Sequence, residues 1–234
     1  MFKPSPANIM LILLGAGINI FGRYFAKALV LPVWLDSVGT FLTAVLLGPI
    51  AGAISGAIMN LITGIFELHQ AWFAIVSIAG GIAVGRFFPR DKKIDSFSVI
   101  ATALFAGLVM TVVSTPLNMY FNHGLTGNEW GDALVKMMGN YISLKVVCTV
   151  AGELLVNMPD KAVSIGITML TLFIVRKYRD KNSGQKNDTA APMTIFFIAA
   201  LTGAALLTGA VSAKASDIAG EYMPVIYSAE DGLI

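Results

Sequence analysis

Charged residues are scarce in this chain. They make up 13% of its 234 residues, whereas hydrophobic residues make up 56% and the mean hydropathy is +0.75. A soluble domain carries about 25% charged residues, so this deficit excludes an ordinary soluble domain. Apolar stretches of the length that crosses a bilayer as a helix, about 20 residues, recur from end to end. The sequence therefore predicts an all-α, multi-pass membrane protein.

Cysteine and histidine are also rare. The single cysteine, Cys148, excludes an internal disulfide and a CxxC metal site, and its apolar neighbours indicate a small buried side chain. His69 and His123 lack the HxxxH spacing of a helical metal site. We therefore expect no metal and no cofactor.

Enzyme motifs are absent from the sequence. It contains no Walker A, HExxH or GxSxG motif, so we expect no enzymatic activity and no ATP hydrolysis by this chain itself. The net charge of +2 is small, and no basic cluster is interleaved with aromatic residues. Nucleic acid is therefore not an expected partner.

The apolar runs predict a bundle of six helices and a seventh C-terminal transmembrane helix. One long run is interrupted at "LGPIAG", where Pro49 suits the first turn of a new helix. The predicted spans are residues 8–31, 35–47, 49–66, 71–87, 97–117, 159–175 and 193–213. The segment between the fifth and sixth spans is long for a loop, and we expect a helix from about Trp130 that extends or precedes the sixth span.

Basic residues near the ends of the spans predict the orientation. Residues 86–95 contain four lysines and arginines and residues 176–186 contain five, and such clusters stay in the cytoplasm. Both segments fit one topology, with the N-terminus in the cytoplasm and the C-terminus outside a bacterial inner membrane. Arg23 and Lys27 are exceptions, because this topology places them near the outer face.

The chain divides into four predicted segments. Residues 1–180 form the six-helix membrane domain, 181–192 a polar cytoplasmic linker, 193–213 the seventh helix, and 214–234 an exported tail. Residues 193–213 also resemble a secretory signal, because a basic approach and an apolar core are followed by small residues. A plain membrane anchor and a cleaved signal both stay open.

Glycines form a stripe in the third predicted helix. Gly48, Gly52, Gly56 and Gly64 are spaced by four or a multiple of four, and Asn60 fills the one remaining position. Because four residues make just over one helical turn, these residues lie on one face. Small residues at this spacing let helices approach closely in lipid, so the stripe predicts a packing surface. Asn60 adds an amide at membrane depth that must bond to a neighbouring helix or a ligand.

Two segments resemble a known transporter family. "LDSVGTFLTAVLLGPIAGAISGAIMNLITGIF" is similar to the second and third helices of the substrate-binding S components of energy-coupling factor (ECF) vitamin transporters. "GELLVNMPDKAVSIGITMLTLFIVRKY" is similar to the last helix of that family, and the resemblance covers about residues 8–180. It implies a six-helix bundle with a ligand cavity near the outer face, which docks on a transmembrane coupling protein and two ATPase subunits.

The sequence departs from this family near both ends. The family's first helix commonly carries an Ala-x-x-x-Ala docking face, whereas the matching region here is "LLGAGINIFG". The residues expected to pack or dock are Gly15, Ala16, Gly22, Gly48, Gly52 and Gly56. At the other end, "MPVIYSAEDGLI" resembles the opening of extracellular β-propeller sensor domains, which would make this chain the membrane part of a longer signalling protein.

Polar and aromatic residues near the outer ends of the spans are the candidate ligand contacts. They are Trp34, Asp36, Asn60, Glu67, His69, Trp72, Asn118, Tyr120, Asn122, Glu153, Asn157 and Lys161. In "FELHQAW", a carboxylate, an imidazole and an indole together suit a small heteroaromatic ring. Two alternatives stay open, because Trp72 also suits a membrane interface and Asp36 also suits a helix N-cap. The long outer loop with Asn118, Tyr120, Asn122 and Trp130 would act as a lid, and surface solvation explains these residues equally well.

The segment "GELLVNMPDK" has two interpretations. If a helix begins near Pro159, Asn157 is its cap and Asp160 lies at its positive end. If the helix continues through Pro159, Asn157 and Lys161 lie on one face. Ionisable groups at membrane depth are kept for a function or are paired, so a ligand contact competes with pairing to a nearby carboxylate. For a neutral or anionic vitamin, Lys161 and Arg23 would be the positive contacts.

The predicted function is capture of a vitamin or related metabolite outside the cell, with separate ATPase subunits driving its passage inward. A ligand-sensing module fused to an exported propeller is the alternative from a different class, and a structural anchor is a third. The first six helices favour the transporter, whereas the seventh helix and the tail favour the sensor. The ligand stays open, because riboflavin, thiamine, a pyrimidine and pyridoxine fit the outer residues equally.

Overall fold

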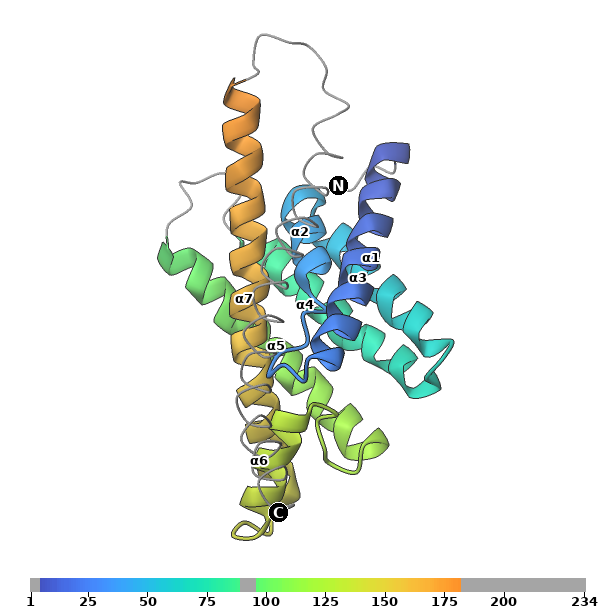
Figure 1. The fold of residues 1–234 in the computed structure, drawn as a ribbon, viewed down its shortest axis with the longest axis vertical. Helices are drawn as coiled ribbons and strands as arrows, with labels where there is room; N and C mark the ends of the chain where they lie inside the picture. Colours follow the sequence, from blue (N-terminus) through green and yellow to red (C-terminus); the bar gives the residue numbers. More distant parts are fainter. Residues whose placement is uncertain (1–4, 89–95, 182–234) are drawn as a thin grey trace, which may run out of the picture.

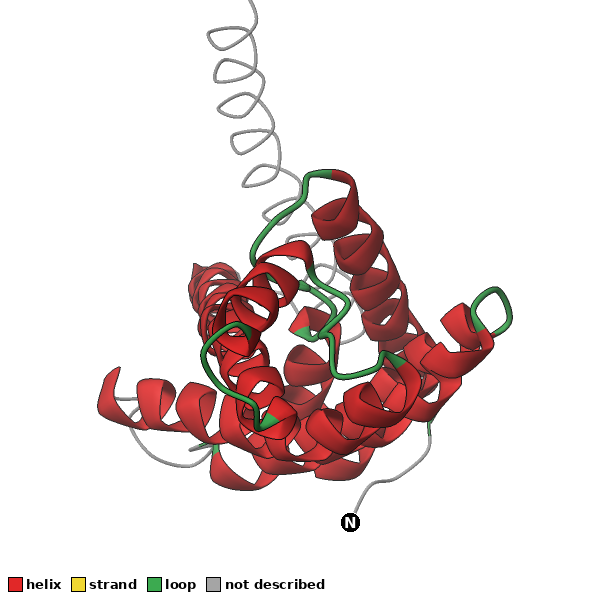
Figure 2. Cartoon of the chain, turned by 90° about the horizontal axis from the view of Figure 1, so that it is seen from below, coloured by secondary structure: helices red, strands yellow, loops and turns green. Residues whose placement is uncertain are grey.

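The described part of the chain is helical. The computed structural model describes residues 5–88 and 96–181, with side chains to residue 175, so the predicted seventh helix and exported tail, and all but the first residue of the predicted linker, lie outside the described residues. The elements are α1 (Pro6–Ala28), α2 (Val38–Leu47), α3 (Pro49–Gly64), the 3₁₀ helix η1 (Leu68–Phe73), α4 (Ala74–Phe87), α5 (Ser96–Phe121), α6 (Glu129–Gly139) and α7 (Lys145–Lys181) (Figure 1). Figure 2, which views the molecule from below, shows no strand among the described residues, so the all-α prediction is confirmed for this part.

Within the residues that the structure describes, four helical segments are long and apolar enough to cross a membrane. They are Pro6–Ala28, Leu68–Phe87, Ser96–Phe121 and Lys145–Val175. α2 and α3 are apolar but have only 10 and 16 residues, and a helix needs about 20 residues to cross the hydrocarbon core. The chain thus has the features of a membrane-embedded protein, while the predicted count of six spans plus a seventh is not confirmed.

The turn between α2 and α3 depends on two adjacent residues. Gly48 adopts a φ of 113°, which residues with a side chain rarely adopt, and Pro49 occupies the first turn of α3. α2 therefore ends at Leu47 and α3 begins at Pro49, as the sequence predicts. The two short helices then pack against each other as an antiparallel pair.

The glycine stripe of α3 lies against α2 and α4. A methyl group added to Gly52 would lie 2.5 Å from Cβ of Ala44, and one added to Gly56 would lie 2.7 Å from Cβ of Ser77. From the opposite side, a methyl group on Gly81 of α4 would lie 2.6 Å from backbone atoms of α3. The stripe is therefore a surface of close backbone approach between neighbouring helices, which is how small residues promote packing in lipid.

The small residues of α1 are also used inside the chain. Gly15 lies so close to α2 that a methyl group on Gly39 would be 1.9 Å from the Gly15 carbonyl oxygen. A methyl group on Gly22 would be 2.1 Å from the carbonyl oxygen of Leu35, and Ala16 is buried between them. These predicted docking residues of α1 are therefore covered within the chain, and a partner could contact them only if α1 separated from α2.

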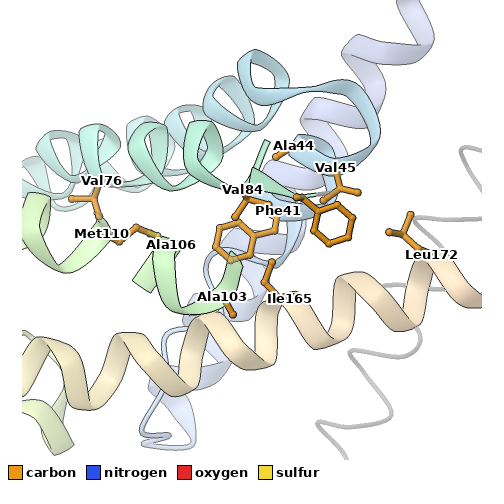
Figure 3. Packing of buried hydrophobic residues seen from close by; sticks show 11 residues of the cluster. Phe41, Ala44, Val45, Val76, Val84, Ala103, Ala106, Met110, Ile165 and Leu172 are labelled. Atoms are coloured by element: carbon orange, nitrogen blue, oxygen red, sulfur yellow. The ribbon is translucent and has the colours of Figure 1, made fainter. Parts of the chain in front are cut away.

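The apolar core lies between α2, α4, α5 and α7 (Figure 3). Phe41 of α2 and Ile165 of α7 are fully or almost fully buried in it, together with Val84 and Ala106. Large apolar side chains also cover the outside, and Val112 of α5 is 72% exposed. Because a water-soluble domain rarely exposes so much apolar surface, these outer faces suit contact with lipid.

α7 is one continuous helix, which overturns part of the prediction. The predicted sixth span began near Pro159, but the helix begins at Lys145 and contains Pro159 in its interior. Of the two interpretations of this segment, Asn157 as a helix cap is therefore wrong, and continuation of the helix through Pro159 is confirmed. A proline inside a helix removes one backbone hydrogen bond and costs about 3 kcal/mol. The side chains of Glu153 and Lys161 on either side are bonded to α5 and to the α1–α2 connection, and these tertiary contacts keep the helix continuous.

The structure also decides two other predicted helix starts, those of α2 and α6. Asp36 is not the N-cap of α2, because Ser37 occupies that position. The helix predicted from about Trp130 is α6, which is separate from α7 and begins where the Asn128 side chain accepts a hydrogen bond from the Trp130 amide. α6 is amphipathic, and it packs on α7 beside the connection between α1 and α2.

Candidate functional site

A polar cavity of about 200 Å³ lies beside the C-terminal ends of α1, α3 and α5 and beside the first half of α7. The ends of α1 and α5 and the first half of α7 lie in the lower half of Figure 1. The predicted residues that line the cavity are Trp34, Asp36, Asn60, Glu67, His69, Asn118, Asn122, Glu153, Asn157 and Lys161. These residues are up to 127 positions apart in the chain, counting from Trp34 to Lys161, yet they converge on one space.

Trp72 and Tyr120 do not line this cavity. Trp72 is 54% exposed and its ring stacks on Phe121 at 6.2 Å between centroids. Tyr120 is 78% exposed and meets the edge of the same Phe121 ring at 4.8 Å. Asn118 of α5 and Asn122, which directly follows this helix, are one turn apart and both line the cavity, so residue 120 between them faces the opposite side. Trp72 points outward because residues 68–73 form a 3₁₀ turn rather than the first turn of an α-helix.

Glu153 is the centre of a hydrogen-bond cluster between α5 and α7. Its carboxylate is 4% exposed and accepts hydrogen bonds from the Ser114 hydroxyl, from Asn118 Nδ2 at 2.5 Å and from Asn157 Nδ2 at 2.8 Å. The Asn157 amide also donates to Thr111 Oγ1 at 3.1 Å. A hydrogen bond to a charged group contributes about 1.5–3 kcal/mol, so the cluster ties the two helices together at cavity depth.

Asn60 links α3 to α4 at the side of the cavity. Its Nδ2 donates to the Gly56 carbonyl at 3.0 Å and to Ser77 Oγ at 2.7 Å. Its Oδ1 accepts no hydrogen bond within the described residues, and the same is true of Asn157 Oδ1. Both side chains line the cavity, and neither oxygen is closed off from it, so each is available to a donor on a bound molecule.

A four-charge cluster lies beside these amides. Lys161 contacts Asp160 directly, donates to Ser37 Oγ at 2.8 Å, and has its Nζ 3.7 Å from Asp36 Oδ1. The other oxygen of Asp36 lies 3.8 Å from Arg23 Nη1. The cluster therefore alternates two cations with two carboxylates, and its net charge is zero.

Asp160 fixes the connection between α1 and α2. This residue is fully buried, and its Oδ1 accepts hydrogen bonds from the backbone amides of Trp34 at 3.0 Å and Leu35 at 2.6 Å. Leu35 has a φ of 54° and Val30 a φ of 52°, a region where side-chain-bearing residues are strained. The hydrogen bonds to Asp160 offset this strain and bring Trp34 and Asp36 to the cavity.

The same connection is held from its other side by α6. Asn128 Nδ2 donates to the Leu31 carbonyl at 3.1 Å, and Trp130 Nε1 donates to the Val30 carbonyl at 2.9 Å. Residues 29–37, which join α1 to α2, are therefore bonded to both α6 and α7. The sequence predicted Trp130 as part of a lid, and its indole instead anchors a wall of the cavity.

The rim of the cavity is more open. Lys27 Nζ lies 3.6 Å from Glu67 Oε1, and these side chains are 69% and 42% exposed. His69 Nε2 and Gln70 Nε2 are 2.9 Å apart, and the Arg23 guanidinium lies 5.4 Å from the centroid of the Trp34 ring. Ion pairs as exposed as Lys27 and Glu67 contribute only about 0–1 kcal/mol, so this side of the cavity opens at little cost.

Sequence reasoning missed several lining residues. The lining residues that were not selected as candidate contacts are Lys27, Gln70, Phe73, Val76, Ser77, Met110, Ser114, Thr126 and Gly127. Arg23 was expected, but only as a positive contact for the ligand. Ser114 was detectable, because it lies four residues before Asn118 in an apolar helix and therefore on the same face. Ser77 had no such signal, since its role depends on the contact between α4 and α3.

The donor set suits reversible binding rather than metal coordination. No group of three or more His, Cys, Asp or Glu side chains that would hold a metal ion is present within residues 5–88 and 96–175. The cavity instead combines carboxylates, amides and hydroxyls with the apolar side chains of Trp34, Phe73 and Met110. Comparisons with protein-family models, with curated proteins and with solved structures gave no match to this chain.

Proposed function

We propose that this chain is the membrane-embedded substrate-binding component of an ECF-type uptake transporter, which binds a vitamin or related metabolite. The observation that carries the proposal is the polar cavity at one end of an apolar helical bundle. Ligand pockets combine apolar walls with a few convergent polar groups, and this cavity has both. Ionisable residues at membrane depth are expensive, which supports a functional use for Glu153 and Lys161.

The proposed architecture assigns six helices to the bundle. α1, α2, α3, η1 with α4, α5 and α7 would be the six, α6 would lie at the outer surface, and 193–213 would be a seventh span. The cavity-lining segments lie at the helix ends that the positions of the lysines and arginines place outside. This arrangement supports a bacterial inner-membrane protein with a cytoplasmic N-terminus, an exported C-terminus and a binding site that faces outward.

Energy for transport would come from partners. The sequence lacks an ATP-binding motif, so delivery of the ligand to the cytoplasm requires a transmembrane coupling protein and two ATPase subunits. Their docking surface would use exposed apolar residues of the bundle, because Gly15, Ala16 and Gly22 are covered by α2 and the connection that precedes it.

A ligand-sensing membrane module is the second candidate function. It is favoured by the apolar segment 193–213 and by the tail "MPVIYSAEDGLI", which resembles the start of an exported propeller domain. The two functions differ in their partners. Co-purification of a coupling protein with two ATPase subunits supports the transporter, whereas a reading frame that continues into several hundred residues of propeller and kinase supports the sensor.

The shared core of both functions is reversible binding of a small molecule, which native mass spectrometry of the gently purified protein tests. We expect a co-purifying molecule whose retention falls about tenfold in Asn60→Ala, because an amide that lines the cavity is lost. Asn140→Ala is the matched control, since Asn140 is exposed at the end of α6. Absence of any bound molecule, together with equal behaviour of both variants, would contradict the proposal.

A further inference from the structure

Charge pairing within the cavity indicates the class of molecule that it binds. Each lysine and arginine that lines the cavity already has a carboxylate within 4.0 Å: Arg23 has Asp36, Lys27 has Glu67, and Lys161 has Asp36 and Asp160. An anionic ligand would have to compete with these internal carboxylates. The sequence-based expectation that Arg23 and Lys161 would receive an anionic group is therefore not favoured by the geometry.

Glu153 is the carboxylate that remains without a cation. Among the described side chains, no lysine, arginine or histidine nitrogen lies within 4.0 Å of its oxygens. Its three partners, Ser114, Asn118 and Asn157, are neutral donors. Lys161 acts on Glu153 electrostatically only from beyond 4.0 Å. A buried carboxylate without a directly bonded counter-charge is costly in a protein interior, and this one is 4% exposed and lines the cavity.

Two amide oxygens in the same cavity are further hydrogen-bond acceptors that a ligand could use. Asn60 Oδ1 and Asn157 Oδ1 are acceptors that have no partner within the described residues. The Nδ2 groups of Asn118 and Asn157 donate hydrogen bonds to protein oxygens in this cluster. The deep part of the cavity therefore offers the Glu153 carboxylate and the amide oxygens of Asn60 and Asn157 to a ligand, while both N–H groups of these two amides donate to protein oxygens.

The apolar residues that line the cavity indicate that the rest of the ligand is apolar and contains a ring. Trp34, Phe73, Val76 and Met110 border the same space, and rings pack well against aromatic and thioether side chains. The cavity volume of about 200 Å³ suits a molecule of one or two small rings. Resting on the proposed binding function, we infer that the cavity binds a small ring-containing organic cation whose nitrogen group donates hydrogen bonds to Glu153.

Three probes of equal shape and different charge test this inference. Benzamidine is a planar cation with N–H donors, benzamide is its neutral counterpart, and benzoate is its anionic counterpart. With purified, ligand-free protein in detergent, isothermal titration calorimetry should give benzamidine at least a tenfold higher affinity than benzamide, and benzoate the lowest affinity. A hydrogen bond between charged groups contributes enough for a difference of about this size.

A variant at Glu153 and a control variant outside the cavity test whether the preference for the cation depends on the Glu153 charge. Glu153→Gln should reduce the ratio of benzamidine to benzamide affinity to about one, because the negative charge is lost. Glu129→Gln is the matched control, since the same chemical change is made at an exposed position of α6 that does not line the cavity. Because the affinity ratio is measured within one preparation, a partly unfolded fraction of a variant does not change it.

Asp36→Asn provides a test that does not alter Glu153. This change removes the carboxylate that Arg23 and Lys161 share, so benzoate affinity should rise at least tenfold relative to wild type. An unchanged benzoate affinity would overturn the view that internal carboxylates exclude anions. Equal affinities for benzamidine and benzamide in the wild type would likewise overturn the role assigned to the Glu153 charge.

Failure of this inference is distinguishable from failure of the binding function. A co-purifying molecule that is an anion, or a preference for benzoate, would overturn the cationic class and leave a small-molecule binding protein. No co-purifying molecule and no saturable binding of any probe would overturn both. Retention of a ring-bearing cation that is lost in Glu153→Gln supports both.

Discussion

Asp160, a single residue near the middle of α7, joins this helix to the connection between α1 and α2. Its carboxylate contacts Lys161 and accepts hydrogen bonds from the Trp34 and Leu35 amides. Because Leu35 is held in a strained conformation, this carboxylate stabilises both a charge and a backbone geometry. The wall of the cavity therefore depends on a residue that does not itself line it.

Asp160→Asn should lower the free energy of unfolding by about 3 kcal/mol or more, because Lys161 loses its direct charge partner in a buried position. Thermal unfolding of the purified protein in detergent measures this loss. The exposed variant Glu129→Gln should unfold at the wild-type temperature. An Asp160→Asn protein as stable as wild type would show that Asp36 alone neutralises Lys161.

Single residues also show where sequence reasoning succeeds and fails. Asn118 and Asn122 were predicted to act together, and their four-residue spacing places both at the cavity. Tyr120 was predicted with them because it is close in sequence, although its helical phase points it away. Lys161 was selected as a polar residue at depth, and Asp160 beside it is one partner. Its other partners, Asp36 and Ser37, lie in the α1–α2 connection and could not be identified from the local sequence.

At the scale of elements, local signals were sufficient where two or three neighbouring residues determine the structure. Gly48 and Pro49 specify the α2–α3 turn by their own conformational preferences, and this turn was predicted. For α7 the sequence left two interpretations open, because Pro159 is also a local signal for a helix start. The contacts that keep α7 continuous involve α5 and residues 29–37, which are distant in sequence.

Pro159→Ala should therefore raise the stability of the protein, by up to about 3 kcal/mol, since an alanine restores a backbone hydrogen bond and has a higher helix propensity. Residue 159 is exposed, so the smaller side chain leaves no cavity in the core. Thermal unfolding in detergent measures the change. A loss of stability would instead support a helix start at this proline.

At the scale of the whole molecule, the chain combines an apolar exterior with one deep polar space. Composition predicted the exterior, because a mean hydropathy of +0.75 with 13% charged residues leaves few alternatives. The polar space could be predicted only as a set of candidate residues near one end of the helices. Their arrangement, in which cations are already paired and Glu153 is not, depends on packing between distant helices.

The orientation of the molecule is testable at the two ends of one span. Leu68 and Phe87 are exposed apolar residues that begin and end the segment formed by η1 and α4, and Leu68 lies on the cavity side next to Glu67. In a Cys148→Ser background, a membrane-impermeant maleimide should label Leu68→Cys in intact cells and Phe87→Cys only after permeabilisation. The reverse pattern would turn the cavity toward the cytoplasm and contradict uptake.

The two sides of the cavity mouth differ in how firmly they are closed. Residues 29–37 are hydrogen-bonded to Asn128 and Trp130 on one side and to the buried Asp160 of α7 on the other, so displacing them would break several hydrogen bonds together. Across the mouth, Lys27 and Glu67 meet in solvent and separate easily. Under the proposed binding function, a solute is expected to enter and leave beside η1, where exchange requires side-chain rotation at the surface rather than movement of a helix.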